Sequence, residues 1–225
     1  TLRMLGQICL VTDKLTEALR YYLQCLELQE AGFGSQDNEV LKTRLFLSRV
    51  ELGLAKYKEC RGHFDYIQNI IDSKGEDIDP SLTFWTFFMK GLFELEYSKR
   101  YLVALKMFKD AHELLKKFPK KDLTSSVELY CFIGYCQVRL LEMENAKKTI
   151  NEVTELITQE YHEEDHYHMI KVHSLNGLLF STLDLNLQAK QSFEKSLQLS
   201  KHYFGENHTS TALAYQKLGE INLNE

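Results

Sequence analysis

A small residue returns every 42 or 43 positions along this chain of 225 residues, each time inside an apolar helical pattern. We call these positions the column residues; they are Gly6, Ser48, Gly91, Gly134, Gly177 and Gly219. A second small residue follows about twelve positions later, at Ala18, Cys60, Ala104, Ala146 and Ala189. A bulky residue stands four positions beyond each of those, at Tyr22, Phe64, Phe108, Ile150 and Phe193. A fixed period of this length is typical of stacked helical hairpins.

The apolar spacing predicts two helices in each period. The expected ranges are 1–12 and 14–31, 37–55 and 57–73, 80–97 and 100–117, 122–141 and 143–160, 166–183 and 186–203, with a lone helix at 208–223. One- or two-residue turns close each hairpin, and longer connections with glycine or proline separate the hairpins. We therefore expect an all-α chain, a single domain over residues 1–225, in which about five and a half antiparallel hairpins stack as a right-handed superhelical solenoid.

Charge and hydropathy narrow the range of partners. The net charge is −5, and no basic stripe stands out, so the sequence argues against direct nucleic-acid binding. No apolar run is long enough to span a membrane, and no secretory signal is visible at the start. The helical pattern runs into both ends of the sequence, as it would in a piece of a longer protein.

The five cysteines, at positions 9, 25, 60, 131 and 136, do not pair evenly. Cys60 occupies a small-residue packing position, and Cys25 lies on the same helix face as Ala18. We expect all five to be structural thiols of a reducing compartment, so the predicted location is intracellular, in cytoplasm or nucleus.

These repeated residues resemble the tetratricopeptide repeat. The fourth repeat carries Tyr130, Ile133-Gly134, Ala146 and Ile150, and the other repeats carry equivalent residues in register. The usual family period is about 34 residues, whereas the longer period here is similar to the extended repeats of kinesin light chains, of scaffold subunits in large complexes and of bacterial peptide-sensing regulators. The resemblance implies a helical scaffold that binds a protein or peptide partner.

The candidate binding residues lie at fixed offsets from the column residues, on the first helix of each hairpin. In a solenoid these helices line the concave side and form an aromatic and aliphatic trough with cationic edges, which suits a peptide with apolar anchors. The alternative is that the long helices close over this face and bury it. The residues expected to contact a partner are Arg49, Trp85, Phe88, Leu92, Phe132, Tyr135, Arg139 and Lys171.

One segment of the chain matches a known metal-binding motif. The segment from His162 to His166 satisfies the His-Glu-x-x-His pattern of zinc proteases, which needs both histidines on one helix face. It falls in a connection between repeats, and its two middle residues are acidic. We interpret it as a solvated loop, with adventitious metal binding and catalysis as the alternatives, and predict no catalytic residue, metal or cofactor.

The leading hypothesis is a non-catalytic protein–protein interaction scaffold that binds a peptide segment of a partner, with no nucleic acid, membrane or small-molecule substrate. The alternative is a peptide-sensing regulatory module of a signalling or transcription regulator. A metallohydrolase built on His162 and His166 is a remote third.

Overall fold

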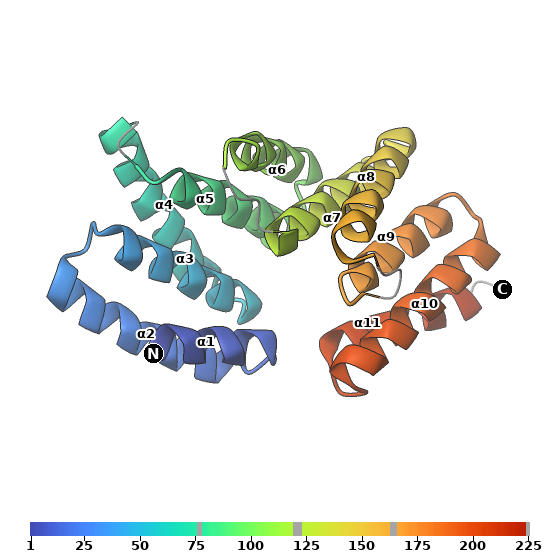
Figure 1. Ribbon diagram of the computed structural model, residues 1–225, viewed down its shortest axis with the longest axis horizontal. Helices are drawn as coiled ribbons and strands as arrows, with labels where there is room; N and C mark the ends of the chain where they lie inside the picture. Colours follow the sequence, from blue (N-terminus) through green and yellow to red (C-terminus); the bar gives the residue numbers. More distant parts are fainter. Residues whose placement is uncertain (76–77, 119–122, 163–165, 224–225) are drawn as a thin grey trace. The chain divides into compact units, whose positions relative to one another are not determined.

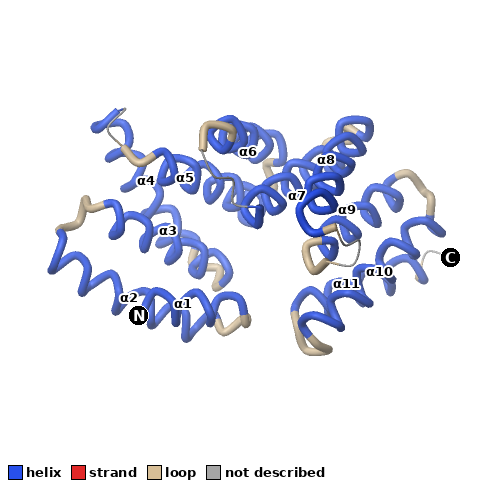
Figure 2. Tube along the Cα trace, viewed as in Figure 1, coloured by secondary structure: helices blue, strands red, loops and turns tan. Residues whose placement is uncertain are grey.

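The computed structural model describes residues 1–75, 78–118, 123–162 and 166–223. Within these ranges the chain is all helical, with eleven α-helices and one π-helical turn, and no strand (Figures 1 and 2). The helices are α1 (Leu2–Val11), α2 (Leu15–Phe33), α3 (Asn38–Gly53), α4 (Tyr57–Lys74), α5 (Pro80–Phe93), α6 (Tyr101–Leu115), α7 (Leu123–Arg139), α8 (Met143–Tyr161), α9 (Met169–Thr182), α10 (Asn186–Phe204) and α11 (Thr209–Asn222). The predicted pairing of helices is confirmed.

The helices divide into two compact units, an N-terminal unit (Thr1–Phe118) and a C-terminal unit (Pro119–Glu225). In the N-terminal unit, three hairpins follow one another, and α3 packs against both the preceding α2 and the following α5. In the C-terminal unit, α9 packs against α7, α8 and α10, and α11 packs on α10. The expectation of a single domain over 1–225 stays a prediction.

Every hairpin closes with the same backbone turn. One residue adopts a left-handed conformation, and the next is the N-cap of the second helix. In four of the five turns, the backbone N–H of that next residue donates to a carbonyl five positions earlier, as Lys14 does to Cys9 at 2.8 Å. The left-handed residues, with φ between 52° and 62°, are Asp13, Ala55, Lys99, Leu141 and Asp184.

The third hairpin contains one extra residue, and the structure shows where it goes. The equivalent hydrogen bond runs from Arg100 to Glu94, six positions earlier, at 3.1 Å. The last turn of the first helix, Glu94–Ser98, is π-helical. A π-turn accommodates one additional residue in a helix without breaking it. The hairpin therefore keeps its register although Gly91 and Ala104 are separated by thirteen positions, one more than the equivalent residues of the other hairpins.

Four of the five column glycines, Gly6, Gly91, Gly134 and Gly177, are packing positions. A Cβ added at Gly91 would lie 2.6 Å from a ring atom of Phe108, and one at Gly177 would lie 2.7 Å from the ring of Phe193. Real Cβ atoms do not approach other atoms so closely, so a larger residue would force the helices apart. The second small residues, Ala18, Cys60, Ala104, Ala146 and Ala189, are all 0% exposed.

The five cysteines are free and buried. Burial raises the pKa of Cys60, Cys131 and Cys136 to about 12. The reactive form of a thiol is the thiolate, so the raised pKa lowers the reactivity of these three side chains. The free and buried state of all five cysteines agrees with the structural role expected from the sequence.

Candidate partner-binding site

The best-formed candidate site lies between two first helices of the N-terminal unit, α3 and α5. Both helices begin at an aspartate cap. The Oδ1 atom of Asp37 accepts a hydrogen bond from the Glu39 N–H at 2.8 Å, and that of Asp79 accepts one from the Ser81 N–H at 2.9 Å. Pro80 occupies the first turn of α5, where its missing N–H costs nothing. The caps fix where each helix starts and therefore which residues face each other.

A hollow of about 70 Å³ lies between these helices. Arg49 and Trp85, two of the residues predicted from sequence to contact a partner, both line it. Its floor is apolar, because Leu45 and Met89 are only 5% and 2% exposed. We call this surface the α3–α5 hollow; its lining residues are Lys42, Leu45, Phe46, Arg49, Ser81, Trp85 and Met89.

Stacked rings support the walls of the hollow. Phe46 stacks on Tyr22 of α2, with ring centroids 5.7 Å apart and planes 4° from parallel. Trp85 packs edge-to-face on Phe84 at 5.1 Å and on Phe88 at 5.4 Å. Such pairs hold aromatic side chains in one orientation. Trp85 and Phe46 are therefore rigid features of this surface, which lowers the entropy lost when a ligand binds.

One end of the hollow carries a network of charges. The Lys42 ammonium lies 3.0 Å from Asp79 and 3.2 Å from Glu39, which also pairs with Arg3. Burial alone would raise the pKa of Asp79, but its hydrogen bond from the Ser81 backbone and the Lys42 ammonium bring this pKa below its ordinary value. The pKa of Glu39 is also lowered, chiefly by its hydrogen bond from Arg3. These pairs join α3 to α5 and to α1.

A buried hydroxyl lies behind the hollow. Tyr22 is fully buried, and its hydroxyl has no hydrogen-bond partner among the described residues. Burial raises the pKa of this phenol, and the charges of Arg49 and Arg3 oppose that shift. Tyr22 is therefore neutral, and the Arg49 charge lies close enough to influence it.

Two of the predicted contact residues are instead part of the core. Phe88 is 0% exposed, and its ring packs on Phe84 and Phe108. Leu92 is 7% exposed. Both residues support the α5 wall from behind, because the apolar face of α5 is wide enough to pack against α6 as well as to line the hollow. We do not include them among the residues that contact a partner.

The other four predicted contact residues belong to the C-terminal unit. Phe132 and Tyr135 on α7 are half-buried, and Arg139 at the end of α7 is exposed. Lys171 on α9 is exposed, and its ammonium lies 2.6 Å from Glu128 of α7. That these four residues line one trough together with Trp85 stays a prediction, because they belong to a separate unit from Trp85.

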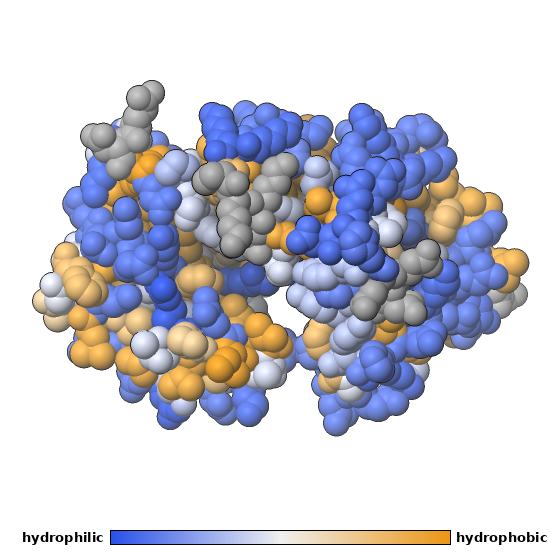
Figure 3. Space-filling model, in the orientation of Figure 1, coloured by the Kyte–Doolittle hydropathy of each residue, from blue (hydrophilic) through white to orange (hydrophobic). Residues whose placement is uncertain are grey.

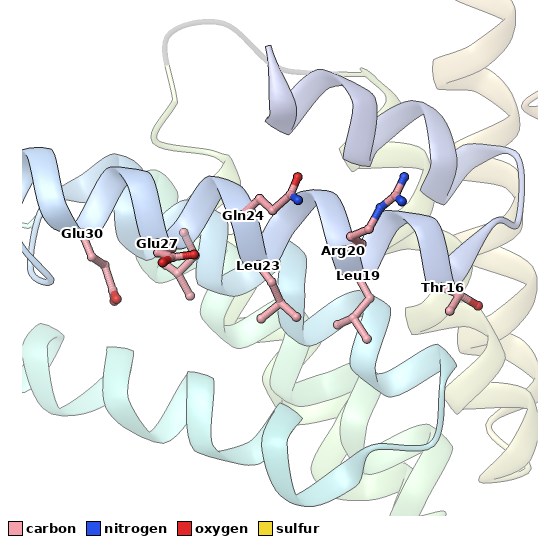
Figure 4. Close-up of a pocket in the computed structure, with 8 residues that line it drawn as sticks. Thr16, Leu19, Arg20, Leu23, Gln24, Glu27 and Glu30 are labelled. Carbon is pink, nitrogen blue, oxygen red and sulfur yellow. The ribbon is translucent and has the colours of Figure 1, made fainter.

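A second, more open depression of about 580 Å³ follows α2 alone and was not foreseen from the sequence. Figure 4 shows Leu19 and Leu23 pointing to one side of the helix, with Arg20 and Gln24 on the other. Because only one helix lines this depression, it encloses a ligand less well than the α3–α5 hollow. Its lining residues are Thr16, Leu19, Arg20, Leu23, Gln24, Leu26, Glu27 and Glu30.

The segment from His162 to His166 does not provide the helix face that a zinc protease requires. Helix α8 ends at Tyr161, and His162 has a left-handed φ of 54°. His166 stacks on Tyr161 with ring centroids 3.6 Å apart. Residues 163–165 lie outside the described residues. In the described ranges, no group of three or more histidine, cysteine, aspartate or glutamate side chains is arranged to hold a metal ion.

Lys42 and Ser81 also line the hollow, and the sequence analysis missed them. Lys42 precedes Arg49 by seven residues, and Ser81 precedes Trp85 by four, so each repeats the helical spacing of a predicted residue. Extending the predicted face by one or two turns toward the helix N-termini would have found them.

Comparison with known proteins supports the fold. No family model matches the sequence, and no curated protein does either. Among solved structures, the apo form of RapI superposes with a TM-score of 0.71 at 17% identity, covering 96% of this chain and 57% of RapI. The TPR-like repeats of a putative kinesin light chain from Podosopora anserina superpose with a TM-score of 0.62 at 11% identity, covering 90% of this chain and 95% of that one.

A third similar structure is Cut9, in the APC/C hetero-tetramer Cut9–Hcn1, with a TM-score of 0.57 at 18% identity over 96% of this chain and 41% of that one. The chain therefore has the fold of tetratricopeptide-like helical repeats, as the sequence resemblance implied. It spans little more than half the length of RapI. None of the described helices is long and apolar enough to cross a membrane.

Proposed function

We propose that this chain is a non-catalytic interaction scaffold that binds a peptide segment of a partner protein, and that the α3–α5 hollow holds one side chain of that peptide. The observation that carries the proposal is that Arg49 and Trp85, on neighbouring first helices, line one hollow with an apolar floor. A large aromatic residue beside an arginine is the usual composition of an interaction hot spot.

The size of the hollow favours a peptide over a small-molecule substrate. Pockets for whole small molecules enclose about 300–1,000 Å³, whereas this hollow encloses about 70 Å³. That volume suits a single apolar side chain of a ligand whose remaining contacts lie on the surrounding surface. Arg49, at the end of the hollow away from Asp79, would then meet an acidic group or a backbone carbonyl of the peptide.

The remaining parts of the proposal rest on the composition. The net charge of −5 favours a protein partner over nucleic acid, and the five buried thiols favour an intracellular location, in cytoplasm or nucleus. Membership in a larger complex is part of the same proposal.

The experiment is to select binding peptides from a displayed random library with the whole chain, and then to measure the affinity of the best one for variants. Trp85→Ala should weaken binding by about 2 kcal/mol or more. If the selected peptide is acidic, Arg49→Glu should weaken its binding and reduce the salt dependence of its association. Lys109→Glu on α6 is the control, because Lys109 is exposed and lies outside the hollow.

Thermal melts must show that each variant is folded. If the folded Trp85 and Arg49 variants bind like the parent while Lys109→Glu binds poorly, the partner uses the second-helix surface and this assignment is wrong.

The second candidate function is a peptide-sensing regulatory module. It is favoured by the division of the chain into two compact units, because a sensor needs two parts whose relation changes on binding. Small-angle scattering with and without the selected peptide separates the two functions. A scaffold keeps its radius of gyration, whereas a sensor changes it.

A further inference from the structure

The α3–α5 hollow differs from the other apolar surface of the N-terminal unit in how its lining is packed. Figure 3 shows apolar surface gathered over the N-terminal hairpin, at the lower left of the view. Large apolar side chains of that hairpin, such as Met4 and Leu23, are exposed. In the hollow, Leu45 and Met89 are instead almost fully buried and form a floor. An open surface accepts side chains of any size, whereas a hollow with a floor and walls accepts only those that fit.

Two rows of residues at helical spacing face each other across the hollow. On α3, Leu45 precedes Arg49 by four residues, and on α5, Trp85 precedes Met89 by four. Arg49 and Trp85 are half-buried at the surface, while Leu45 and Met89 close the bottom. The depth that a ligand side chain can reach is therefore set by Leu45 and Met89.

The walls of the hollow are supported from behind. Phe46 stacks on Tyr22, and the tip of the Tyr22 ring lies against α1, because a Cβ added at Gly6 would be 2.9 Å from the ζ carbon of Tyr22. Trp85 packs on two rings of its own helix that are at most 1% exposed. In such close packing one ring cannot move unless its neighbours move too. The width of the hollow is therefore fixed as firmly as its depth.

The volume of the hollow is too small for an aromatic ring. The hollow encloses about 70 Å³, whereas a protein cavity that admits benzene encloses about 150 Å³. A branched aliphatic side chain is more compact than a ring and ends in methyl groups, which match an apolar floor. The hollow is therefore shaped for an aliphatic side chain.

We propose that the α3–α5 hollow selects its peptide by the size of the anchor. It binds a valine, leucine or isoleucine side chain and rejects phenylalanine and tyrosine, and Leu45 and Met89 are the residues that set this limit. The inference rests on the proposed function, because it names the side chain that the same peptide places in the same hollow.

The test uses the whole chain and the best peptide selected from the displayed library. An alanine scan of the peptide identifies its anchor, and versions with valine, leucine, phenylalanine or tyrosine there are compared by fluorescence anisotropy. The emission of Trp85, the only tryptophan of the chain, reports whether unlabelled peptides reach the hollow. We expect the leucine peptide to bind about tenfold more tightly than the phenylalanine peptide, or better, because a ring overfills the hollow.

Met89→Ala deepens the hollow and should bring the affinities of these two peptides to within about threefold of each other. Leu45→Ala deepens it from the other helix and is the second variant. Met107→Ala is the matched control, because Met107 is half-buried on α6 and does not line the hollow. Met107→Ala should keep the preference of the parent for leucine. Thermal melts identify the variants that are folded.

The comparison within the parent needs no substitution in the chain, so it decides the matter even if both floor variants unfold. A parent that binds the phenylalanine peptide as tightly as the leucine peptide overturns the size limit. A preference for leucine that survives in a folded Met89→Ala and a folded Leu45→Ala overturns it as well.

The proposed function fails in a different way. If Trp85→Ala leaves binding of the leucine peptide unchanged, the peptide does not use the hollow, and the function and the size limit both fail. If Trp85→Ala weakens leucine and phenylalanine peptides that bind the parent equally, the function stands and only the size limit is wrong.

Discussion

Gly91 and Gly219 occupy the same position of the repeat, yet their surroundings differ completely. A Cβ added at Gly91 would lie 2.6 Å from the Phe108 ring, whereas one at Gly219 would find no atom within 4 Å. The reason is that α5 is followed by α6 and forms a hairpin, while α11 is the last helix described and has no second helix beside it. The periodic sequence therefore defines a packing face, and the neighbouring helix decides whether that face is occupied.

The largest expected effect tests this contrast directly. Gly91→Leu should destabilise the N-terminal unit by about 1–3 kcal/mol, because the new side chain must displace the Phe108 ring. The measurement is urea unfolding followed by the fluorescence of Trp85, the only tryptophan, which lies in the same unit.

Gly219→Leu is the matched control. Because its site is open, this change should leave the free energy of unfolding unchanged or raise it slightly through the better helix propensity of leucine. Unfolding of this variant is followed by circular dichroism. Equal losses of unfolding free energy in Gly91→Leu and Gly219→Leu would refute the contrast between the two sites.

A smaller effect is expected where the neighbour of the glycine is flexible. A Cβ at Gly134 would lie 2.6 Å from a terminal methyl of Leu175 on α9, and not against a ring of α8. The end of a leucine side chain can move more easily than a ring, so Gly134→Ala should cost about 1 kcal/mol or less. Adding Leu175→Val should recover part of that loss, and a double-mutant cycle measures the coupling between the two positions. Strict additivity of the two changes would show that these side chains do not meet.

The smallest expected effect concerns the charges that join α3 to α5. The pKa of Asp79 is below its ordinary value in the folded chain, so its contribution to stability is complete above about pH 4 and is lost as the pH falls through the lowered value. The contribution should be about 0.2–1 kcal/mol, since the Asp79 and Lys42 side chains are partly exposed.

Asp79→Asn is the test, because asparagine keeps the cap acceptor for the Ser81 N–H and removes the charge. Unfolding free energies of the parent and the variant should differ at pH 7, and the difference should shrink as the pH falls below about 4. A constant difference across that range would assign the effect to the cap and not to the ion pair.

The sequence was sufficient to predict the helices and their pairing. Three signals agreed at each of the five complete repeats: the column residue, the small residue at positions such as Ala104, and the bulky residue four positions later. The turns were also predictable, because a one- or two-residue connection allows only an antiparallel hairpin. Arg49 and Trp85 were placed on one face by their offset from the column, and the structure brings them to one hollow.

The parts of the structure that could not be predicted depend on contacts between side chains that are far apart in the sequence. Helical spacing alone does not show that Phe88 turns toward Phe108 while Trp85 lines the hollow, since both belong to the wide apolar face of α5. Nor does the period show that Leu175 fills the space over Gly134, a role that an aromatic ring of the second helix has over Gly91. These outcomes are decided by which side chains fit together.

The buried thiols can be used to measure local unfolding in each part of the chain. Cys9, Cys25 and Cys60 lie on α1, α2 and α4 of the N-terminal unit, and Cys131 and Cys136 lie on α7 of the C-terminal unit. A thiol shielded in this way reacts with an alkylating reagent only when its own helix detaches or its unit unfolds. The labelling rate of each cysteine, read by mass spectrometry under native conditions, therefore times the opening of individual hairpins without any engineered label.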